Sequence, residues 1–315
     1  MRNIRRAIRL PEDTFTSDST VTPPAQVHAK KTNPIAPRIE FVDVDGVSLR
    51  VAIRAGHGTP LLLFNGIGAN LELVFPFIAA LPGREVIVFD MPGVGGSPMW
   101  LLPRRFSGIA RLSRRLLDRM GYSLVDVAGV SWGGAVAQQF AHQYPERCRR
   151  LVLSATSAGA VMVPGRPSAL MKMATPQRYL SPKYMAEAAG DIYGGEVRSR
   201  PELIEAHTAR IIPPQFMGYV YQLLAGMGWT SIYWLHKLTQ PTLIMAGTED
   251  PLVPPINARL LAWLIPNNKL HMVEGGGHLF MLHCLDQIGP VIQEFLDAPD
   301  RPVTRARQRK AASTG

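Results

Sequence analysis

The stretch "SLVDVAGVSWGGAVAQQFAHQY", residues 123–144, decides the fold, because it combines a buried strand, a tight turn and an amphipathic helix. Its first eight residues are mostly apolar and β-type, and its last ten carry apolar residues at helical spacing. Between them, Gly129 to Gly133 fits the pattern G-x-S-x-G. In so tight a strand-to-helix turn, flanking glycines relieve backbone crowding and the central hydroxyl is left exposed. Ser131 is therefore a candidate nucleophile; the alternative is a serine that caps the helix N-terminus.

Further strand patterns extend from this stretch in both directions. Upstream, two alternating runs flank Asp45-Gly46, which is a strong signal for a β-hairpin. Five other short β-type runs are separated by helical patterns: "PLLLFNG", "EVIVFDMPG", "RRLVLSAT", "PTLIMAGTED" and "KLHMVEGGGH". This alternation predicts an α/β protein with a mostly parallel central sheet flanked by helices.

The regular alternation stops between residues 157 and 238. This segment contains six of the 13 methionines and many aromatic residues, which suits either ordinary core packing or an adaptable apolar wall over a ligand. We therefore expect an inserted, mainly helical cap. The chain is then divided into a disordered basic extension (1–38), the first part of the core (39–156), the cap (157–238), the second part of the core (239–297) and a disordered basic tail (298–315).

The net charge of +10 is concentrated at the two ends of the chain. Residues 1–38 carry seven Lys/Arg against three Asp/Glu, and residues 298–315 carry five against one, so the body holds only about +2. This distribution does not indicate a nucleic-acid-binding face. Two interpretations of the ends stand: solvated, disordered tails, or basic segments that touch an anionic surface such as a lipid-coated particle.

The sequence also bears on the compartment. The basic start "MRNIRRAIRL" leads into no apolar run of the kind a secretory signal needs, and no stretch approaches the roughly 18 apolar residues of a membrane span. The two cysteines, Cys148 and Cys284, offer no disulfide framework and no metal-ligand spacing. We therefore expect a cytoplasmic protein without a transmembrane segment.

A serine nucleophile needs a base to take its proton, and the base needs an acid to fix its tautomer. In enzymes with this turn the chain order is Ser, acid, His. The expected acid is Asp250 in "PTLIMAGTEDPLVP", because a short carboxylate before Pro251 can turn back from the strand end toward the site. Glu249 is the reserve, and a purely structural Asp-Pro turn is the alternative.

The expected base is His278, at the end of "KLHMVEGGGH", where three glycines let the backbone approach and aim the ring. Its alternative is a loop histidine without a role. The other seven histidines are set aside by position: His28 in the extension, His57 in a hairpin-type loop, His142 on the helix after Ser131, His207 and His236 in the cap, His271 within a strand and His283 in the last helix.

Hydrolysis at Ser131 also needs donors for an oxyanion. One expected donor is the backbone N–H of Trp132, directly after the nucleophile, and the other is that of Ile67, where Gly66 permits a turn after an early strand. A plain turn at Asn65-Gly66 is the alternative. The glycine-rich segments lack the spacing of nucleotide-binding loops and no H-E-x-x-H occurs, so no cofactor and no metal are expected.

Several segments beyond the strand-to-helix turn at Ser131 give the sequence a specific resemblance. They are "NGIGANLELVFPF", "FDMPGVGGS", "GVSWGGAVAQQFAHQYPERC", "AGAVMVPG", "GWTSIYWLHKLTQPTL" and "INARLLAWLIPN". From about Phe41 to Leu296, cap included, the chain resembles the intracellular poly(3-hydroxyalkanoate) depolymerases of the medium-chain-length type, in the α/β-hydrolase superfamily. The long N-terminal extension and "GTEDP", less acidic than the family pattern, depart from it.

The resemblance implies a serine hydrolase that cleaves the esters of a storage polyester held in granules and releases 3-hydroxy acids. The family's nucleophile, acid and base fall on Ser131, Asp250 and His278. The implied partner is the granule or a hydroxyalkanoate ester, with the basic ends as candidate contacts to the granule surface. Two alternatives remain: a hydroxyacyl transferase or general carboxylesterase on the same fold, and a granule-coating protein without activity.

Overall fold

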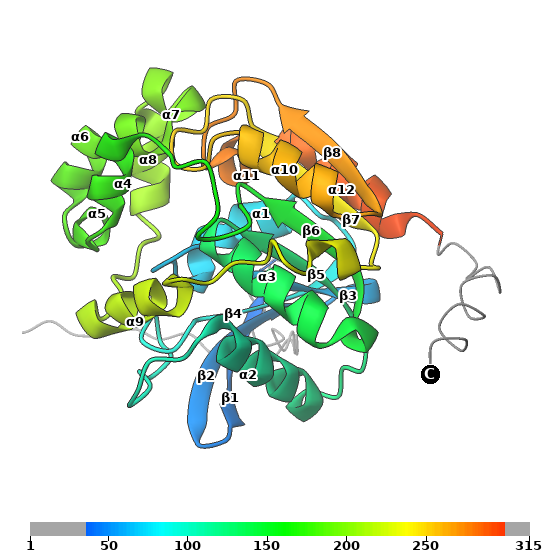
Figure 1. The fold of residues 1–315 in the computed structure, drawn as a ribbon. Helices are drawn as coiled ribbons and strands as arrows, with labels where there is room; N and C mark the ends of the chain where they lie inside the picture. Colours follow the sequence, from blue (N-terminus) through cyan, green and yellow to red (C-terminus); the bar gives the residue numbers. More distant parts are fainter. Residues whose placement is uncertain (1–35, 300–315) are drawn as a thin grey trace, which may run out of the picture. The chain divides into compact units, whose positions relative to one another are not determined.

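Eight β-type runs form one sheet in the computed structural model, which describes residues 36–299 (Figure 1). Their order in the sheet is β1-β2-β4-β3-β5-β6-β7-β8, and the six strands from β4 to β8 are parallel. The strands are β1 (Arg38–Val44), β2 (Val47–Arg54), β3 (His57–Phe64), β4 (Arg84–Phe89), β5 (Val125–Val130), β6 (Cys148–Ser154), β7 (Thr242–Gly247) and β8 (Asn268–Val273). The predicted α/β class with a mostly parallel sheet is confirmed.

The predicted hairpin forms the antiparallel edge of the sheet. β1 pairs with β2, and β2 pairs in turn with β4, both antiparallel. At the turn, Asp45 and Gly46 have φ of 56° and 80°, the pair of positive values that a two-residue hairpin turn with the sheet's own twist requires.

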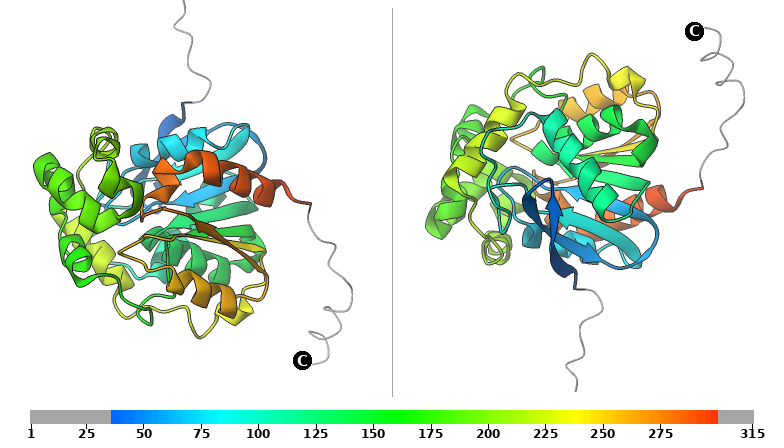
Figure 2. Two further views of the ribbon diagram at one scale, coloured as in Figure 1. Left: turned by 90° about the horizontal axis from the view of Figure 1, so that it is seen from above. Right: turned by 90° about the horizontal axis from the view of Figure 1, so that it is seen from below.

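Helices cover both faces of the sheet because every second side chain of a buried strand points to the same face (Figure 2). In β3, Leu62 and Phe64 join one hydrophobic cluster, and Leu61 and Leu63 join the other. The first face carries α2 (Phe106–Arg119), α3 (Trp132–Gln143) and α10 (Ile256–Leu264), and the second carries α1 (Phe75–Ala79), α11 (Phe280–His283) and α12 (Leu285–Asp297).

The segment between β6 and β7 forms the inserted helical cap, seen in green in Figures 1 and 2. Its helices are α4 (Pro167–Met173), α5 (Gln177–Leu180), α6 (Pro182–Tyr193), α7 (Gly195–Ser199), α8 (Glu202–Thr208) and α9 (Phe216–Gly226). A short 3-10 turn at Leu235–Lys237 follows them, and two others lie outside the cap, at Leu71–Val74 and Pro145–Arg147. Met185, Ile192 and Ile204 of the cap are buried in one hydrophobic cluster, which also includes Leu252 from the loop after β7, so the cap packs against the core of the protein.

Two histidine placements expected from the sequence were wrong. His57 begins β3 rather than lying in a hairpin-type loop, because it pairs with Arg84 ahead of a register shift. His283 ends the short helix α11, because the backbone at Cys284 (φ −102°, ψ 37°) interrupts the helical path before α12 begins.

The predicted basic extension and tail fall mostly on residues 1–35 and 300–315, which lie outside the described residues. Within residues 36–299, no helix is both long enough and apolar enough to cross a membrane.

Candidate active site

Ser131 occupies the turn between β5 and α3 in a strained conformation, with φ 55° and ψ −119°. A positive φ is uncommon for a residue with a side chain and is kept only where the surroundings enforce it. Here the Ser131 N–H donates to the carbonyl of Ser154 (2.9 Å), and the Ser131 carbonyl accepts from Gly134 N–H (2.9 Å) and Thr156 Oγ1 (2.8 Å). The Ser131 side chain makes no helix-capping hydrogen bond, so the capping alternative was wrong.

The glycines of G-x-S-x-G are needed because other backbone segments approach them closely. A Cβ atom at Gly129 would lie 2.3 Å from the carbonyl oxygen of Gly133, and one at Gly133 would lie 2.3 Å from that of Phe64. Helix α3 therefore packs directly on β5 and on the end of β3. This close packing fixes the position from which the Ser131 hydroxyl projects.

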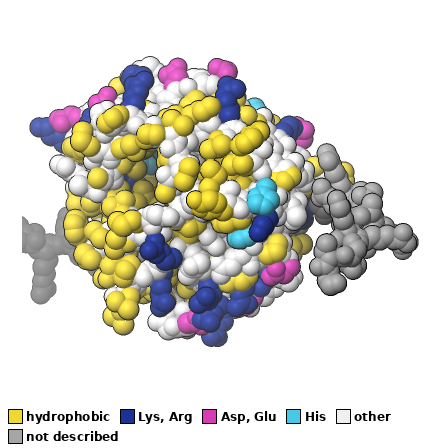
Figure 3. All heavy atoms as spheres, in the orientation of Figure 1, with side chains coloured by type: hydrophobic (Ala, Val, Ile, Leu, Met, Phe, Trp, Pro, Cys, Tyr) yellow, Lys and Arg dark blue, Asp and Glu magenta, His cyan; other side chains and the backbone are white. Residues whose placement is uncertain are grey.

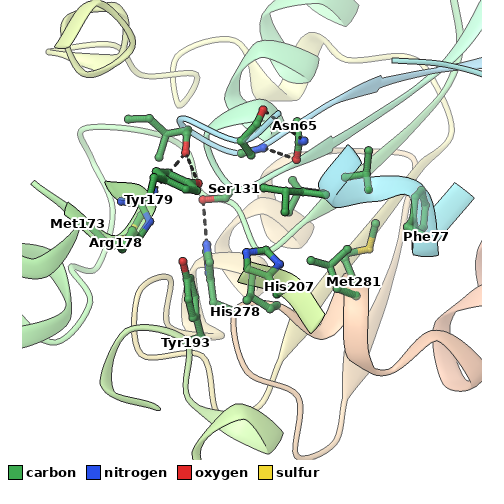
Figure 4. A pocket seen from close by; sticks show the side chains of 18 residues that line it. Asn65, Phe77, Ser131, Met173, Arg178, Tyr179, Tyr193, His207, His278 and Met281 are labelled. Atoms are coloured by element: carbon green, nitrogen blue, oxygen red, sulfur yellow. Dashed lines mark hydrogen bonds between the residues drawn. The ribbon is translucent and has the colours of Figure 1, made fainter. Parts of the chain in front are cut away.

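The structure brings Ser131, His278 and Asp250 into one hydrogen-bonded chain. His278 Nε2 lies 3.0 Å from Ser131 Oγ, the contact dashed in Figure 4, and His278 Nδ1 lies 2.7 Å from Asp250 Oδ2. The other carboxylate oxygen, Oδ1, accepts the N–H groups of Leu252 and Val253, both at 2.9 Å. The Asp250 carboxylate is fully buried, whereas Glu249 is exposed. Asp250, not Glu249, is therefore the acid that contacts the histidine.

The loop that carries His278 is held by the cap. The His278 N–H donates to the carbonyl of Tyr193, at the end of α6, over 2.6 Å. A Cβ at Gly277 would lie 2.2 Å from that same carbonyl oxygen, and one at Gly247 would lie 2.1 Å from the carbonyl oxygen of Gly276. The glycine run before the histidine thus lets the loop pass between the end of β7 and the cap.

The two expected oxyanion donors come from different segments: Ile67 lies in the loop after β3, and Trp132 directly follows Ser131. Ile67 lines the same cavity as Ser131, and within residues 36–299 its N–H has no hydrogen-bond partner. Trp132 is the first residue of α3, and a helix leaves the N–H groups of its first turn without partners in the helix. Asn65 stabilises the turn before Ile67, because its side chain donates to the carbonyl of Asn70 (2.9 Å) and accepts from Gly66 N–H (2.9 Å). The donor roles of both N–H groups stay a prediction.

Three cap residues contact Trp132 and the loop of Ile67 and Gly68, and the sequence interpretation missed these contacts. The Gln222 side-chain oxygen accepts the N–H of Gly68 (2.9 Å), and its backbone carbonyl accepts the indole N–H of Trp132 (2.8 Å). The hydroxyl of Tyr179 donates to the carbonyl of Ile67 over 2.8 Å, and Arg178 donates to it over 3.2 Å. These contacts join residues 90 to 154 positions apart, so no local motif could have revealed them.

The cavity beside Ser131 encloses about 640 Å³ of space free of protein atoms, part of it continuous with solvent. One part of its wall is apolar and includes Leu73, Val74, Phe77, Met281 and Leu282. Another part is polar and comes from the cap, with Arg178, Tyr179, Tyr193 and His207. Figure 4 shows Phe77 and Met281 on one side of Ser131 and His278, and Arg178 and Tyr179 on the other.

The polar wall is formed by neutral groups apart from Arg178. Burial lowers the pKa of His207 to about 3, with a further contribution from His283, so the ring is uncharged near pH 7. Burial likewise raises the pKa of the Tyr193 phenol, which stays protonated. Within residues 36–299, no three His, Cys, Asp or Glu side chains are grouped so as to hold a metal ion.

Comparison with known proteins places the chain in a family. A model of the alpha/beta hydrolase fold matches residues 59–283. The chain is 57% identical over 258 residues to the poly(3-hydroxyalkanoate) depolymerase of Ectopseudomonas oleovorans. The aligned region covers 81% of this chain and 91% of that protein.

Solved structures agree with that result. A hydrolase from Pseudomonas aeruginosa PA01 is 25% identical with a TM-score of 0.68, and a thermophilic esterase from Thermogutta terrifontis is 25% identical with a TM-score of 0.69. Both superpositions cover 82% of this chain and 98% of the solved structure's chain. The resemblance drawn from the sequence is confirmed: the chain belongs to the alpha/beta hydrolase fold family and, within it, to the family of the poly(3-hydroxyalkanoate) depolymerases.

Proposed function

We propose that the protein is a serine hydrolase that cleaves the ester bonds of medium-chain-length poly(3-hydroxyalkanoate) and releases 3-hydroxy acids. The observation that supports it most is the hydrogen-bonded chain from Asp250 through His278 to Ser131, at the wall of a largely apolar cavity. The 57% identity to a poly(3-hydroxyalkanoate) depolymerase supports the same substrate class.

In the proposed reaction, His278 takes the proton of Ser131 as the hydroxyl oxygen attacks the ester carbonyl. The N–H groups of Trp132 and Ile67 stabilise the oxyanion that develops, each such donor typically contributing about 10²- to 10³-fold in rate. Asp250 holds the imidazole in the tautomer that can accept the proton and stabilises the imidazolium. The protonated His278 then donates to the departing alkoxide oxygen, and water cleaves the acyl-serine by the same route.

The apolar wall of the cavity is evidence for a polyester whose alkyl side chains are of medium length. A medium-length alkyl group gains roughly 0.8 kcal/mol for each CH₂ that it buries, and Phe77, Met281 and Leu282 offer it such a surface beside the reacting atoms. Methionine and leucine side chains also adapt to substituents of different length.

We further propose that the enzyme works in the cytoplasm on the granule surface. The support is an apolar patch that we define by Leu101, Leu102, Phe216 and Met227, whose exposed fractions run from 63% to 95%. The loop bearing Leu101 contacts α9, because Tyr221 donates to the carbonyl of Leu101. Figure 3 shows hydrophobic side chains gathered over α9 and this loop. Such concentrations of exposed apolar side chains mark interaction surfaces, and this one lies partly on the cap helix α9.

Charged substitutions test whether this apolar patch binds the granule. We expect the double variant Leu101→Asp, Phe216→Asp to bind and degrade native granules roughly 10- to 100-fold less well, because both side chains lose apolar burial. Its hydrolysis of soluble p-nitrophenyl octanoate should stay within twofold of wild type. Trp263→Asp is the matched control, since Trp263 is 81% exposed but lies on α10. Equal loss in the control, or no loss in the double variant, would contradict the patch.

The basic ends are the other proposed contact to the granule, and they fall almost wholly outside the described residues. Contacts made through charge weaken with salt, whereas apolar contacts do not. Sedimentation of the granules with wild-type protein and with protein lacking residues 300–315, at low and high salt, therefore separates the two contributions.

Product analysis tests the proposed function itself. Purified wild-type and Ser131→Ala protein are incubated with native medium-chain-length granules, and the soluble products are identified by mass spectrometry. We expect free 3-hydroxy acids from the wild type alone. Transfer of the acyl group to an added alcohol or thiol without free acid would instead indicate an acyltransferase, and no turnover of any ester would indicate a granule-coating protein.

A further inference from the structure

Arg178 is a buried cation in the wall of the active-site cavity. It lies on α5 of the cap, is only 2% exposed, and lines the cavity together with Ser131 and His278. Arginine stays protonated in proteins, so the cavity contains a full positive charge. In Figure 4 its guanidinium lies on the Tyr179 side of Ser131, away from Phe77.

No anion within the described residues balances this charge. Arg178 donates to the hydroxyl of Tyr219 (2.8 Å) and the carbonyl of Ile67 (3.2 Å), and its guanidinium lies 4.3 Å from the ring centre of Tyr179. All three partners are neutral, and the described residues that line the cavity include no Asp or Glu. The Arg178 Nε–H is buried and has no hydrogen-bond partner within residues 36–299.

Holding the Ile67 carbonyl does not account for the charge. The neutral hydroxyl of Tyr179 already donates to that carbonyl over a shorter distance, 2.8 Å. A buried charge costs several kcal/mol in lost hydration unless it is paired. A counter-ion that enters with the substrate would remove this cost at the moment of binding, and a guanidinium fits the two oxygens of a carboxylate best.

We propose that Arg178 binds the free carboxylate at the end of the polyester chain or of a short oligomer; this inference rests on the proposed function. The ester nearest that carboxylate is then the bond presented to Ser131. Ser131 Oγ forms a bond to the carbonyl carbon of the penultimate unit, and the bond from that carbon to the oxygen of the terminal unit breaks. His278 gives its proton to this oxygen, the terminal unit leaves as a 3-hydroxy acid, and water frees the shortened chain from Ser131.

The test compares two soluble dimers of 3-hydroxyoctanoate, one with a free terminal carboxylate and one with a neutral terminal carboxamide. For wild type we expect kcat/KM to be about 10- to 100-fold higher for the acid, as for a hydrogen bond to a charged group. In Arg178→Met the two dimers should be cleaved at similar rates. Mass spectrometry of the released terminal unit measures both reactions, and p-nitrophenyl octanoate serves as a substrate without a carboxylate.

Tyr179→Phe is the matched control, because it removes a donor to the Ile67 carbonyl but keeps the charge of Arg178. This variant should lower kcat/KM for both dimers by the same factor, so that the ratio of acid to amide stays unchanged. The ratio of kcat/KM for the acid to that for the amide is measured on the wild type. It therefore tests the inference even if Arg178→Met fails to fold. Equal wild-type rates on acid and amide would overturn the inference and leave the proposed function standing. Cleavage of p-nitrophenyl octanoate without cleavage of either dimer would overturn both.

Discussion

Ser131→Ala should leave the fold intact and lower turnover of p-nitrophenyl octanoate by on the order of 10⁶, because the nucleophile and its base act as a unit. Alanine keeps the β-carbon of serine, and the strained turn is held by the backbone bonds to Ser154 and Gly134, which the substitution does not remove. What activity remains would come from the oxyanion donors and from substrate binding. Steady-state rates and thermal melting of both proteins measure the two effects.

Ser154→Ala is the matched control for this experiment. Ser154 ends β6 beside the turn that carries Ser131, and its buried hydroxyl has no hydrogen-bond partner within residues 36–299. Its contact with Ser131 is made through the backbone carbonyl, so the control should turn over within a few-fold of wild type. Activity of Ser131→Ala within tenfold of wild type would remove Ser131 from the mechanism, as would an equal loss in the control.

The fold was predictable because its determinants are local in sequence. Period-two apolar runs identify β1 and β2, continuous apolar runs identify β5 and β7, and helical spacing identifies α3. Chain order and turn glycines then bring Ser131 and His278 to the carboxyl ends of parallel strands. These signals need only a few neighbouring residues each, which is why they can be recognised without coordinates.

The polar wall of the cavity could not be predicted in the same way. Arg178 meets Ile67, and Gln222 meets Gly68, only after the cap has folded over the sheet, across 111 and 154 positions of sequence. Nothing in "PQRYLSP" distinguishes a buried arginine from an ordinary solvated one. The error at His283 has a similar origin, since no glycine or proline marks the break between α11 and α12. Sequence patterns thus locate the reacting groups, and tertiary contacts determine what surrounds them.

Asp250→Asn should lower kcat/KM by about 10⁴ while Glu249→Gln leaves it within twofold. Asp250 Oδ1 accepts two backbone N–H groups, from Leu252 and Val253. An asparagine must keep its carbonyl oxygen there, because turning the amide over would set its NH₂ group against two donors. The NH₂ group then faces His278 Nδ1, which must become an acceptor, and the ring proton moves to Nε2.

In that tautomer the nitrogen 3.0 Å from Ser131 Oγ already carries a proton and cannot accept another. The loss should therefore appear in the chemical step with little change in melting temperature, since the asparagine fits the same space, keeps both backbone hydrogen bonds and only reverses the direction of the third. Glu249 is the fitting control because it precedes Asp250 in the same loop, carries the same charge and is exposed. A loss of less than tenfold in Asp250→Asn, or one of several hundredfold in Glu249→Gln, would mean that another carboxylate orients His278.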